Sequence, residues 1–438
     1  MAHATLSDES TGPTVRGRWT PLRVAIIFIC FFLNAIDGMD IVIMSYIAPV
    51  LKAEWALSPE ALGLVFSASL AGMALGGLFI APLADRFGRR PLIITLLSVI
   101  TVTMLLSSHA QDLTQLILLR AIIGASVGAF LASVTTMAAD FAPRGQQGMV
   151  VATAISGYAL GAVITGLVVA HHLPDHGWRM MLRGAGYVSL IALPLVIAVM
   201  PESIDFLKRV QPKNALPRLN RVLHRLGEAP VAALPPKVSA ARASVTAVFQ
   251  DGRLRGTLCL WLGIIMGFMT FYFLVSWITQ LSVQSGLAVD KAIYAGALFN
   301  FGGFTGTFVI GAFGARFGLQ RATCVALLCG AAVVAAFGYL SVSLAVTLTL
   351  AYLAGFTTNG GFNAFYALAA ALYPTEIRST GIGWAMGIGR IGAVIGPLLG
   401  GVLIGQGLSL AGLLAVFALP LVIAGLASLF IRAATQHH

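Results

Sequence analysis

The chain has 438 residues, of which 58% are hydrophobic and only 10% are charged, and its formal net charge is +11. Soluble domains carry about 25% charged residues, so this composition excludes an ordinary soluble protein and indicates a membrane protein. The arginines and lysines gather in short segments between apolar stretches, which a membrane explains better than nucleic acid does, so no nucleic-acid partner is expected.

The apolar stretches are each long enough to cross a bilayer, which takes about 20 residues. We expect about twelve spans, over residues 24–51, 60–84, 91–108, 112–137, 147–170, 178–200, 254–283, 290–315, 322–341, 344–372, 379–406 and 410–432. The sequence therefore predicts an all-α membrane protein with two six-helix bundles, over 24–200 and 254–432. A basic linker over 201–253 joins them, with tails at 1–23 and 433–438.

The distribution of positive charge predicts the orientation. If both termini are cytoplasmic, the inside loops hold most of the arginines, such as Arg86 and Arg144, together with the linker. The outside loops then hold little beyond Lys52 and Lys291. Positive charge accumulates on the cytoplasmic side of membrane proteins, so we expect cytoplasmic N- and C-termini, in the inner membrane of a bacterium.

An internal repeat relates the two bundles. Arg86-Phe87-Gly88 recurs as Arg316-Phe317-Gly318 at an offset of 230 residues, and Gly161-Ala162-Val163-Ile164 recurs as Gly392-Ala393-Val394-Ile395 at an offset of 231. Repeated halves are common in secondary transporters, whose binding sites lie between the repeats near the middle of the membrane. The many glycines suit close helix packing, or surfaces that slide during transport.

Two carboxylates, Asp37 and Asp40, are the only acidic residues that these spans place near the bilayer centre. Their spacing sets both on one helix face, and carboxylates at this depth commonly mark a proton path. Burial and mutual repulsion disfavour the doubly ionised pair, so we assign proton coupling to both. The alternative is that they are permanently paired with cations, or that they cap a helix broken at Gly38.

Two arginines, Arg120 and Arg390, lie deepest in the membrane and stay charged there. Arg120 suits either pairing with Asp37 or Asp40 or a role in gating, and it is also a candidate for substrate binding. Arg390 has Ala159 as its repeat counterpart, so the scaffold does not require a cation at this position. We expect Arg390 to bind a substrate carboxylate through forked hydrogen bonds, the alternative being a contact with helix carbonyls.

The repeat places Phe268 and Phe271 opposite the two carboxylates, which assigns protons to the first half and the substrate to the second. Aromatic and amide side chains complete the expected substrate site: Asn34, Tyr272, Trp277, Asn300, Phe356, Asn359, Asn363 and Tyr366. For each of these, helix packing is the alternative. No nucleophile, phosphate loop or metal constellation lies at membrane depth, so we expect no enzyme, no metal and no cofactor.

Two segments outside the spans have weaker patterns. His171, His172 and His176 could bind a metal, but we interpret them as part of a solvated outer loop. Residues 216–226 carry arginines at helical spacing and predict an amphipathic helix on anionic membrane lipid.

The turn Ala84-Asp85-Arg86-Phe87-Gly88-Arg89-Arg90 resembles the signature loop of the major facilitator superfamily. The resemblance extends along nearly the whole chain and implies the major facilitator fold. It also implies that the conformational cycle uses the gating residues Asp85, Arg86, Gly88 and Arg89. The second copy of the loop has Ala315 in place of Asp85, which is usual for the superfamily.

Within this superfamily, Asp37-Gly38-Met39-Asp40 followed by Ala48-Pro49 resembles the aromatic acid/proton symporter family. The resemblance implies import of benzoate-like acids, such as hydroxybenzoates or protocatechuate, by alternating access with protons as the coupling ion. A carrier for another organic anion, a sugar or a drug is the alternative, and a transporter-like sensor is a further one. We expect the chain to work as a monomer.

Overall fold

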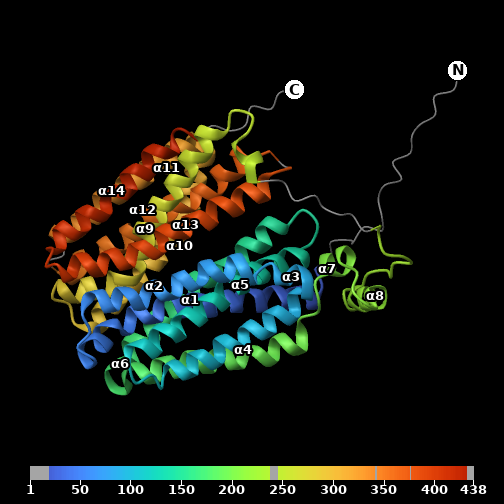
Figure 1. The fold of residues 1–438 in the computed structure, drawn as a ribbon, viewed down its shortest axis with the longest axis horizontal. Helices are drawn as coiled ribbons and strands as arrows, with labels where there is room; N and C mark the ends of the chain where they lie inside the picture. The colour runs from blue at the N-terminus through green and yellow to red at the C-terminus, as the bar shows by residue number, and fades with distance from the viewer. Residues whose placement is uncertain (1–18, 237–244, 341–342, 375, 432–438) are drawn as a thin grey trace.

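The computed structural model describes residues 19–236, 245–340, 343–374 and 376–431, and every regular element in those ranges is a helix. The first half consists of α1 (Pro21–Glu54), α2 (Pro59–Leu75), the π-helix η1 (Gly76–Ile80), α3 (Leu83–Phe87), α4 (Arg89–Ser107), α5 (Leu113–Asp140) and α6 (Gln147–Val199). The second half consists of α9 (Leu254–Gln284), α10 (Val289–Phe317), α11 (Leu319–Leu340), α12 (Leu344–Leu372), α13 (Arg378–Gly405) and α14 (Leu410–Ser428). The halves form two bundles side by side (Figure 1), as predicted.

Among the described residues, ten helices are long and apolar enough to cross a membrane. One of them, α6, crosses twice, because Gly177 has a φ of 71° and interrupts the helix between two antiparallel limbs. Only glycine adopts this conformation without strain. The 29-residue helix α12 packs along α10 and α11 and completes the predicted twelve crossings.

Short polar residues start several helices where the chain enters the membrane. The side chain of Asp112 accepts a hydrogen bond of 2.8 Å from the backbone N–H of Gln115, and Ser58 accepts one of 3.2 Å from Ala61. Such caps satisfy backbone donors that the first turn of a helix leaves unpaired. Proline follows directly at the first position of α2, as at the start of α1, where its fixed φ favours helix initiation.

Glycines join the helices backbone to backbone, and they do so in the same way in both halves. A Cβ atom at Gly161 of α6 would overlap the carbonyl of Ala35 in α1, and one at Gly392 of α13 would overlap the carbonyl of Ile265 in α9. The glycines are 231 residues apart and their partners are 230 apart. The repeat seen in the sequence is therefore a repeat of packing contacts, since small residues let membrane helices approach closely.

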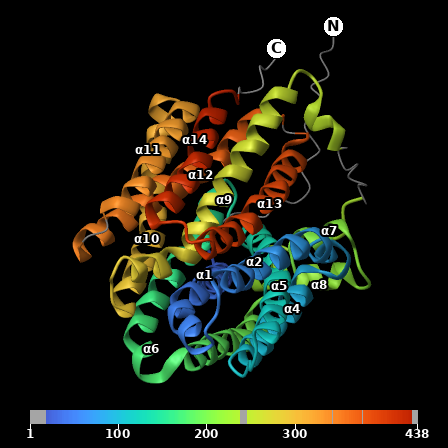
Figure 2. The same cartoon turned by 60° about the vertical axis from the view of Figure 1, so that its left-hand side comes forward.

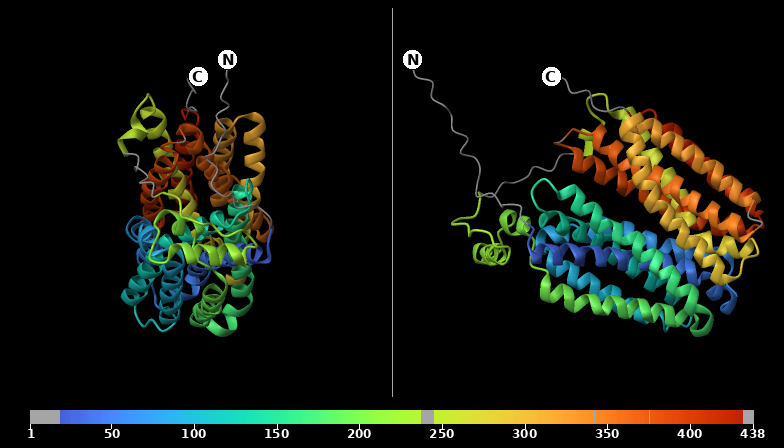
Figure 3. Two further views of the ribbon diagram at one scale, coloured as in Figure 1. Left: turned by 90° about the vertical axis from the view of Figure 1, so that its right-hand side faces the viewer. Right: turned by 180° about the vertical axis from the view of Figure 1, so that it is seen from behind.

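The halves meet at the end of the molecule where α1 ends and α2 begins, which we call the distal end. There Ser67 of α2 donates a hydrogen bond of 2.8 Å to the carbonyl of Val394 in α13, and the hydroxyls of Ser45 and Thr279 lie 3.4 Å apart. Toward the opposite, proximal end, where α1 begins and α14 ends, the ribbons of the two bundles diverge (Figures 1 and 3).

The segment between the halves carries α7 (Ile204–Arg209), α8 (Ala215–Arg225) and the 3₁₀ helix η2 (Val245–Phe249). The predicted helix over 216–226 is confirmed as α8. Its apolar side chains Leu219 and Leu223 are buried. Figure 2 shows α7 and α8 at the proximal end of the first half. An ion pair of 2.6 Å between Arg23 and Glu228 attaches this segment to α1.

Candidate functional site

The two membrane carboxylates lie midway along α1, and only one of them has a cation as a direct partner. Asp37 and Asp40 are each 3% exposed. Arg120 of α5 donates a hydrogen bond of 3.1 Å to Oδ1 of Asp40, and its other terminal nitrogen lies 3.2 Å from the sulfur of Met104. Of the three roles considered for Arg120, the structure shows the pairing, with Asp40 as the partner.

Asp37 lacks such a partner among the described residues, although it lies only one turn from Asp40 on α1. Its Oδ1 atom is buried and makes no hydrogen bond within the part of the chain that the structure describes. Arg390, the other arginine at membrane depth, lies on α13 of the opposite half. The helix continues through Gly38, where a Cβ would overlap the carbonyl of Tyr158 in α6, so the carboxylates do not cap a broken helix.

Arg390 lies on α13 among aromatic rings of α9. It donates a hydrogen bond of 3.0 Å to the hydroxyl of Tyr272, and its guanidinium carbon lies 5.5 Å from the ring centre of Phe268. Within the described residues its remaining N–H groups make no hydrogen bond and no carboxylate forms a salt bridge with it. A guanidinium with open donors can bind a carboxylate through two parallel hydrogen bonds.

An aromatic wall surrounds this arginine. Phe268 packs on Phe362 of α12 at 4.4 Å between ring centres, and Phe271 lies parallel to Phe362 at 6.2 Å. Tyr366, one turn further along α12, contacts the edge of the same ring and is 44% exposed. Phe362 was not among the expected site residues, because a phenylalanine in an apolar helix has no distinctive sequence pattern. Phe268 could have been identified from its repeat relationship to Asp37.

The amide side chains expected at the site make hydrogen bonds within their own helix or pack against a neighbouring helix. Asn34 donates to the carbonyl of Cys30 at 2.8 Å, and Asn300 donates to that of Gly296 at 2.9 Å, both one turn back on their own helix. Asn363 donates to Thr307 of α10 at 2.8 Å. Two further residues of α12 lie against glycines of α10, Asn359 against Gly303 and Phe356 against Gly306.

Trp277 connects the second half to the first. Its indole N–H donates a hydrogen bond of 3.1 Å to the carbonyl of Pro397 in α13, and its ring packs edge-on against Phe66 of α2 at 5.5 Å. The residue is fully buried. It therefore lies in the contact between the halves.

The predicted gating residues lie together at the proximal end of the first half. Arg89 is buried and contacts Asp140 at the end of α5, and it donates a hydrogen bond of 2.7 Å to Ser203. The backbone N–H of Arg89 donates to Glu202 at 2.9 Å. Gly88 has a φ of 105°, which favours glycine, and Glu202 occupies the space that a side chain there would need.

The other two gating residues are exposed. Asp85 forms an ion pair of 2.5 Å with Arg209 of α7, and Arg86 lies over the ring of Phe87 at 5.3 Å. The partners Glu202, Ser203 and Arg209 all come from the segment after α6. The signature loop is thus attached to the linker.

The linker also carries a buried carboxyl paired with α1. Burial raises the pKa of the Glu228 carboxyl, and the Arg23 guanidinium opposes that shift.

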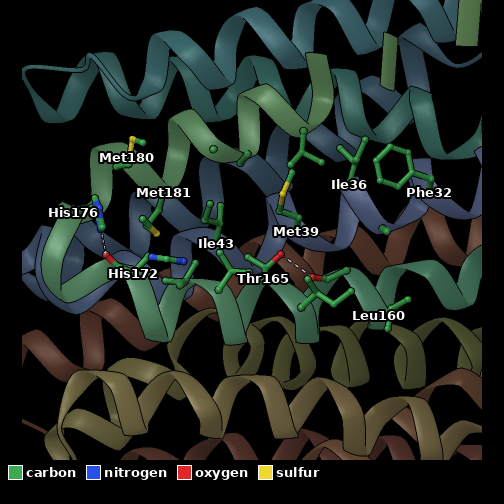
Figure 4. A pocket seen from close by; sticks show the side chains of 18 of the residues that line it. Phe32, Ile36, Met39, Ile43, Leu160, Thr165, His172, His176, Met180 and Met181 are labelled. Atoms are coloured by element: carbon green, nitrogen blue, oxygen red, sulfur yellow. Dashed lines mark hydrogen bonds between the residues drawn. The ribbon is translucent and has the colours of Figure 1, made fainter. Parts of the chain in front are cut away.

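A cavity of about 550 Å³ lies apart from these charges, between α1 and the two limbs of α6. Figure 4 shows its apolar lining, with Met39 and Ile43 of α1 facing Met181, and with His172 and His176 at one end. The histidines belong to the helical turn of α6. No group of three or more metal-ligating side chains is arranged to hold an ion in the described part of the chain. We therefore place the functional site at Asp37 and Arg390.

Comparisons with known proteins identify a matching family model and several similar transporters. The sequence model of the Major Facilitator Superfamily matches residues 27–360 and 294–438. A gallate transporter of Pseudomonas putida is 33% identical over 92% of this chain and 90% of its own length. The 4-hydroxybenzoate transporter PcaK of the same organism is 32% identical over 94% and 92%, and a benzoate transport protein of Acinetobacter baylyi is 29% identical over 87% and 84%.

Solved structures with the same fold have little sequence in common with this chain. The xylose transporter XylE from E. coli, in an inward open conformation, has a TM-score of 0.71 at 16% identity and covers 95% of this chain and 98% of its own. A bacterial homologue of the human lysosomal transporter Spinster, inward-facing and unoccupied, has a TM-score of 0.70 at 17% identity over 94% and 97%. These similarities confirm the predicted fold of two related six-helix bundles.

Proposed function

The chain belongs to the Major Facilitator Superfamily and is a transporter rather than an enzyme, and we propose that it imports a small aromatic carboxylate together with protons. The names of its relatives supply the substrate class: gallate, 4-hydroxybenzoate and benzoate are all aromatic acids. The observation that carries the proposal is the set of open donors on Arg390, which lies among the aromatic rings of α9.

The orientation follows from the charges at the two ends of the bundle. Arg86, Arg144, Arg316 and Arg378 all lie at the proximal end, which we assign to the cytoplasmic side of a bacterial inner membrane. Both termini are then cytoplasmic. The distal end, where the halves pack together, then faces outward.

The substrate site combines one cation with an apolar enclosure. The carboxylate of the acid binds the open N–H groups of Arg390, and the ring stacks among Phe268, Phe362 and Tyr366. Charge-assisted hydrogen bonds to a carboxylate supply about 1.5–3 kcal/mol. A sugar would leave this guanidinium without an anion, so the site favours acids.

The proton binds Asp37, because Asp40 already has Arg120 as its counter-ion. A proton on Asp37 and a carboxylate on Arg390 neutralise both faces of the site, which lowers the cost of closing the halves around it. One proton carried with a monoanion moves no net charge, whereas a second proton would also draw on the membrane potential, at about 2.3 kcal/mol per 100 mV. We propose that a single chain does this, with the proton as coupling ion and no cofactor.

The test is uptake into proteoliposomes at an imposed pH gradient, with labelled aromatic acids, aliphatic acids and sugars. We expect aromatic acids to accumulate when the outside is acidic, and we expect dissipation of the gradient to abolish accumulation. Accumulation of a sugar, with no entry of or competition by aromatic acids, would refute the substrate class. Accumulation unaffected by the pH gradient would refute proton coupling.

A further inference from the structure

A second, much smaller cavity lies where three helices of the first half meet α9 of the second. Its volume is about 20 Å³. Its polar lining comes from α1, α2, α5 and α9, and consists of Asp40, Ser69, Arg120, Tyr272 and Ser276. Tyr272 and Ser276 are one turn apart, so they present their side chains on the same face of α9. The cavity therefore touches both the carboxylate pair and the residue that holds Arg390.

The two serines of this cavity differ from other serines of the bundle. Within the described residues, neither Ser69 nor Ser276 makes a hydrogen bond to protein, and both line the cavity. In contrast, Ser282 on the same helix donates to the carbonyl of Ile278 at 2.8 Å, and Ser133 of α5 donates to Ala129 at 3.0 Å. Ser276 is only 7% exposed, whereas Ser69 is partly exposed. A buried hydroxyl without a protein partner, such as that of Ser276, usually binds ordered water.

The cavity satisfies both physical requirements for one buried water molecule. A water needs at least about 10–15 Å³ of space and two to four polar partners. The volume of about 20 Å³ is enough for one water and too small for any substrate. A bare cation is disfavoured, because the guanidinium of Arg120 lines the same space.

We propose that a single ordered water occupies this cavity and bridges the Asp40–Arg120 pair to Ser276 and Tyr272. Because Tyr272 also accepts a hydrogen bond of 3.0 Å from Arg390, the water completes a hydrogen-bonded chain from the Asp40–Arg120 pair, one turn from the proton site Asp37, to the substrate site of the other half. The inference extends the proposed function, since it adds a route by which the two sites sense each other.

The Asp40–Arg120 pair orients this water. Asp40, ionised and paired with Arg120, only accepts hydrogen bonds, so the water donates to it and accepts from the hydroxyl of Ser276. When Asp37, one turn away, takes up its proton, the repulsion between the two carboxylates is lost, and a shift of Asp40 is passed through the water to Ser276. Ser276 is thus a positioning residue, and α9 responds to protonation in the first half without any charge crossing to the second.

The direct test is a structure of the full chain in lipid nanodiscs at a resolution that shows water, for the parent and for Ser276→Val. We expect density within hydrogen-bond distance of Asp40 and Ser276 in the parent and none in the variant, since the two methyl groups of valine occupy the cavity. An empty cavity in the parent, or density that does not contact Asp40, would overturn the proposal. A strong peak with the short distances of a bound cation would overturn it as well.

The functional test separates coupling from binding. In Ser276→Ala, counterflow exchange of labelled aromatic acid should match the parent, because exchange requires no net proton movement. Accumulation driven by a pH gradient should fall about tenfold, the factor that corresponds to one hydrogen bond of ordinary strength. Ser282→Ala is the matched control, since its hydroxyl bonds only to its own helix, and it should accumulate substrate as the parent does.

Parental accumulation by Ser276→Ala would contradict the bridging role, whatever the density shows. Equal losses of counterflow and accumulation in this variant would contradict it too, because they would indicate a substrate-binding role. If the parent carries no aromatic acid at all, the proposed function fails, while the water in the parent structure still decides this inference separately.

Discussion

Arg120 on α5 and Asp40 on α1 form an ion pair of 3.1 Å, with side chains that are 1% and 2% exposed. The pair joins two helices of the first half inside the membrane. It also distinguishes two carboxylates that the sequence presents as equivalent. Asp37 lies one turn from Asp40, and among the described residues no cation forms an ion pair with it. Four predictions follow from this distinction and from the contacts between the halves.

Removing one member of the buried pair should destabilise the protein more than removing both. Arg120→Met leaves a buried carboxylate uncompensated, which costs about 3–5 kcal/mol, and it should lower the thermal unfolding temperature in detergent markedly. The double variant Arg120→Met with Asp40→Asn should recover most of that loss, because no buried charge remains. A double variant as unstable as Arg120→Met alone would contradict the pairing.

Asp37→Asn should uncouple transport from protons and leave the scaffold intact. Asparagine has nearly the same shape but cannot titrate, so pH-driven accumulation should disappear while counterflow of an aromatic acid continues. The measurement is uptake in proteoliposomes with and without a pH gradient, with thermal unfolding as a check on folding. If Asp37→Asn accumulates substrate like the parent, the proton is carried elsewhere.

Arg390→Lys should weaken the binding of aromatic carboxylates, although the charge is kept. Lysine offers a point charge instead of a planar fork, and loss of one charge-assisted hydrogen bond, about 1.5–3 kcal/mol, corresponds to a rise in Kd of roughly ten- to a hundredfold. Calorimetric titration with benzoate measures this. Binding of benzyl alcohol, which lacks the carboxylate, serves as the control and should not change; an unaltered Kd for benzoate would remove Arg390 from the site.

A side chain at Gly401 should hold the distal end open. A Cβ there would come within 2.6 Å of the carbonyl of Pro59 across the halves, so Gly401→Val should disfavour the packed state. Thr279 is fully buried at that end. A cysteine in its place, Thr279→Cys, should therefore react faster with a membrane-impermeant maleimide when Gly401→Val opens the distal contact. Gly387→Val is the matched control on the same helix, because a Cβ there meets nothing within 4 Å; equal labelling in the two variants would contradict the prediction.

Hydropathy and the repeat were sufficient to predict the fold. Apolar runs define membrane helices because the backbone must satisfy its own hydrogen bonds in lipid. The paired offsets predicted two related halves, and the equivalent contacts of Gly161 and Gly392 agree with that prediction. The helix over 216–226 was predicted from its arginine spacing and is present as α8. At the turn of α6, the predicted spans 147–170 and 178–200 belong to one element that Gly177 interrupts.

The partners of the charged residues could not be predicted with the same success. The choice between pairing and gating for Arg120 depends on how α5 packs against α1, a contact between segments 80 residues apart. Arg209 pairs with Asp85 over 124 residues. Contacts between residues so far apart in the chain cannot be predicted from the local periodicity of the sequence. The substrate-binding role of Asn34 stays a prediction. Its amide donates to the carbonyl of Cys30 one turn back on the same helix, a contact that polar residues in membrane helices commonly make.

The glycine contacts within each half also determine where the molecule can change shape. At Gly161 and Gly392 one backbone rests directly on another, and no side chain can take up a new rotamer there. Each bundle should therefore move as a rigid lever. The hydroxyl pair of Ser45 and Thr279 is then a contact that must separate when the two bundles tilt apart at the distal end.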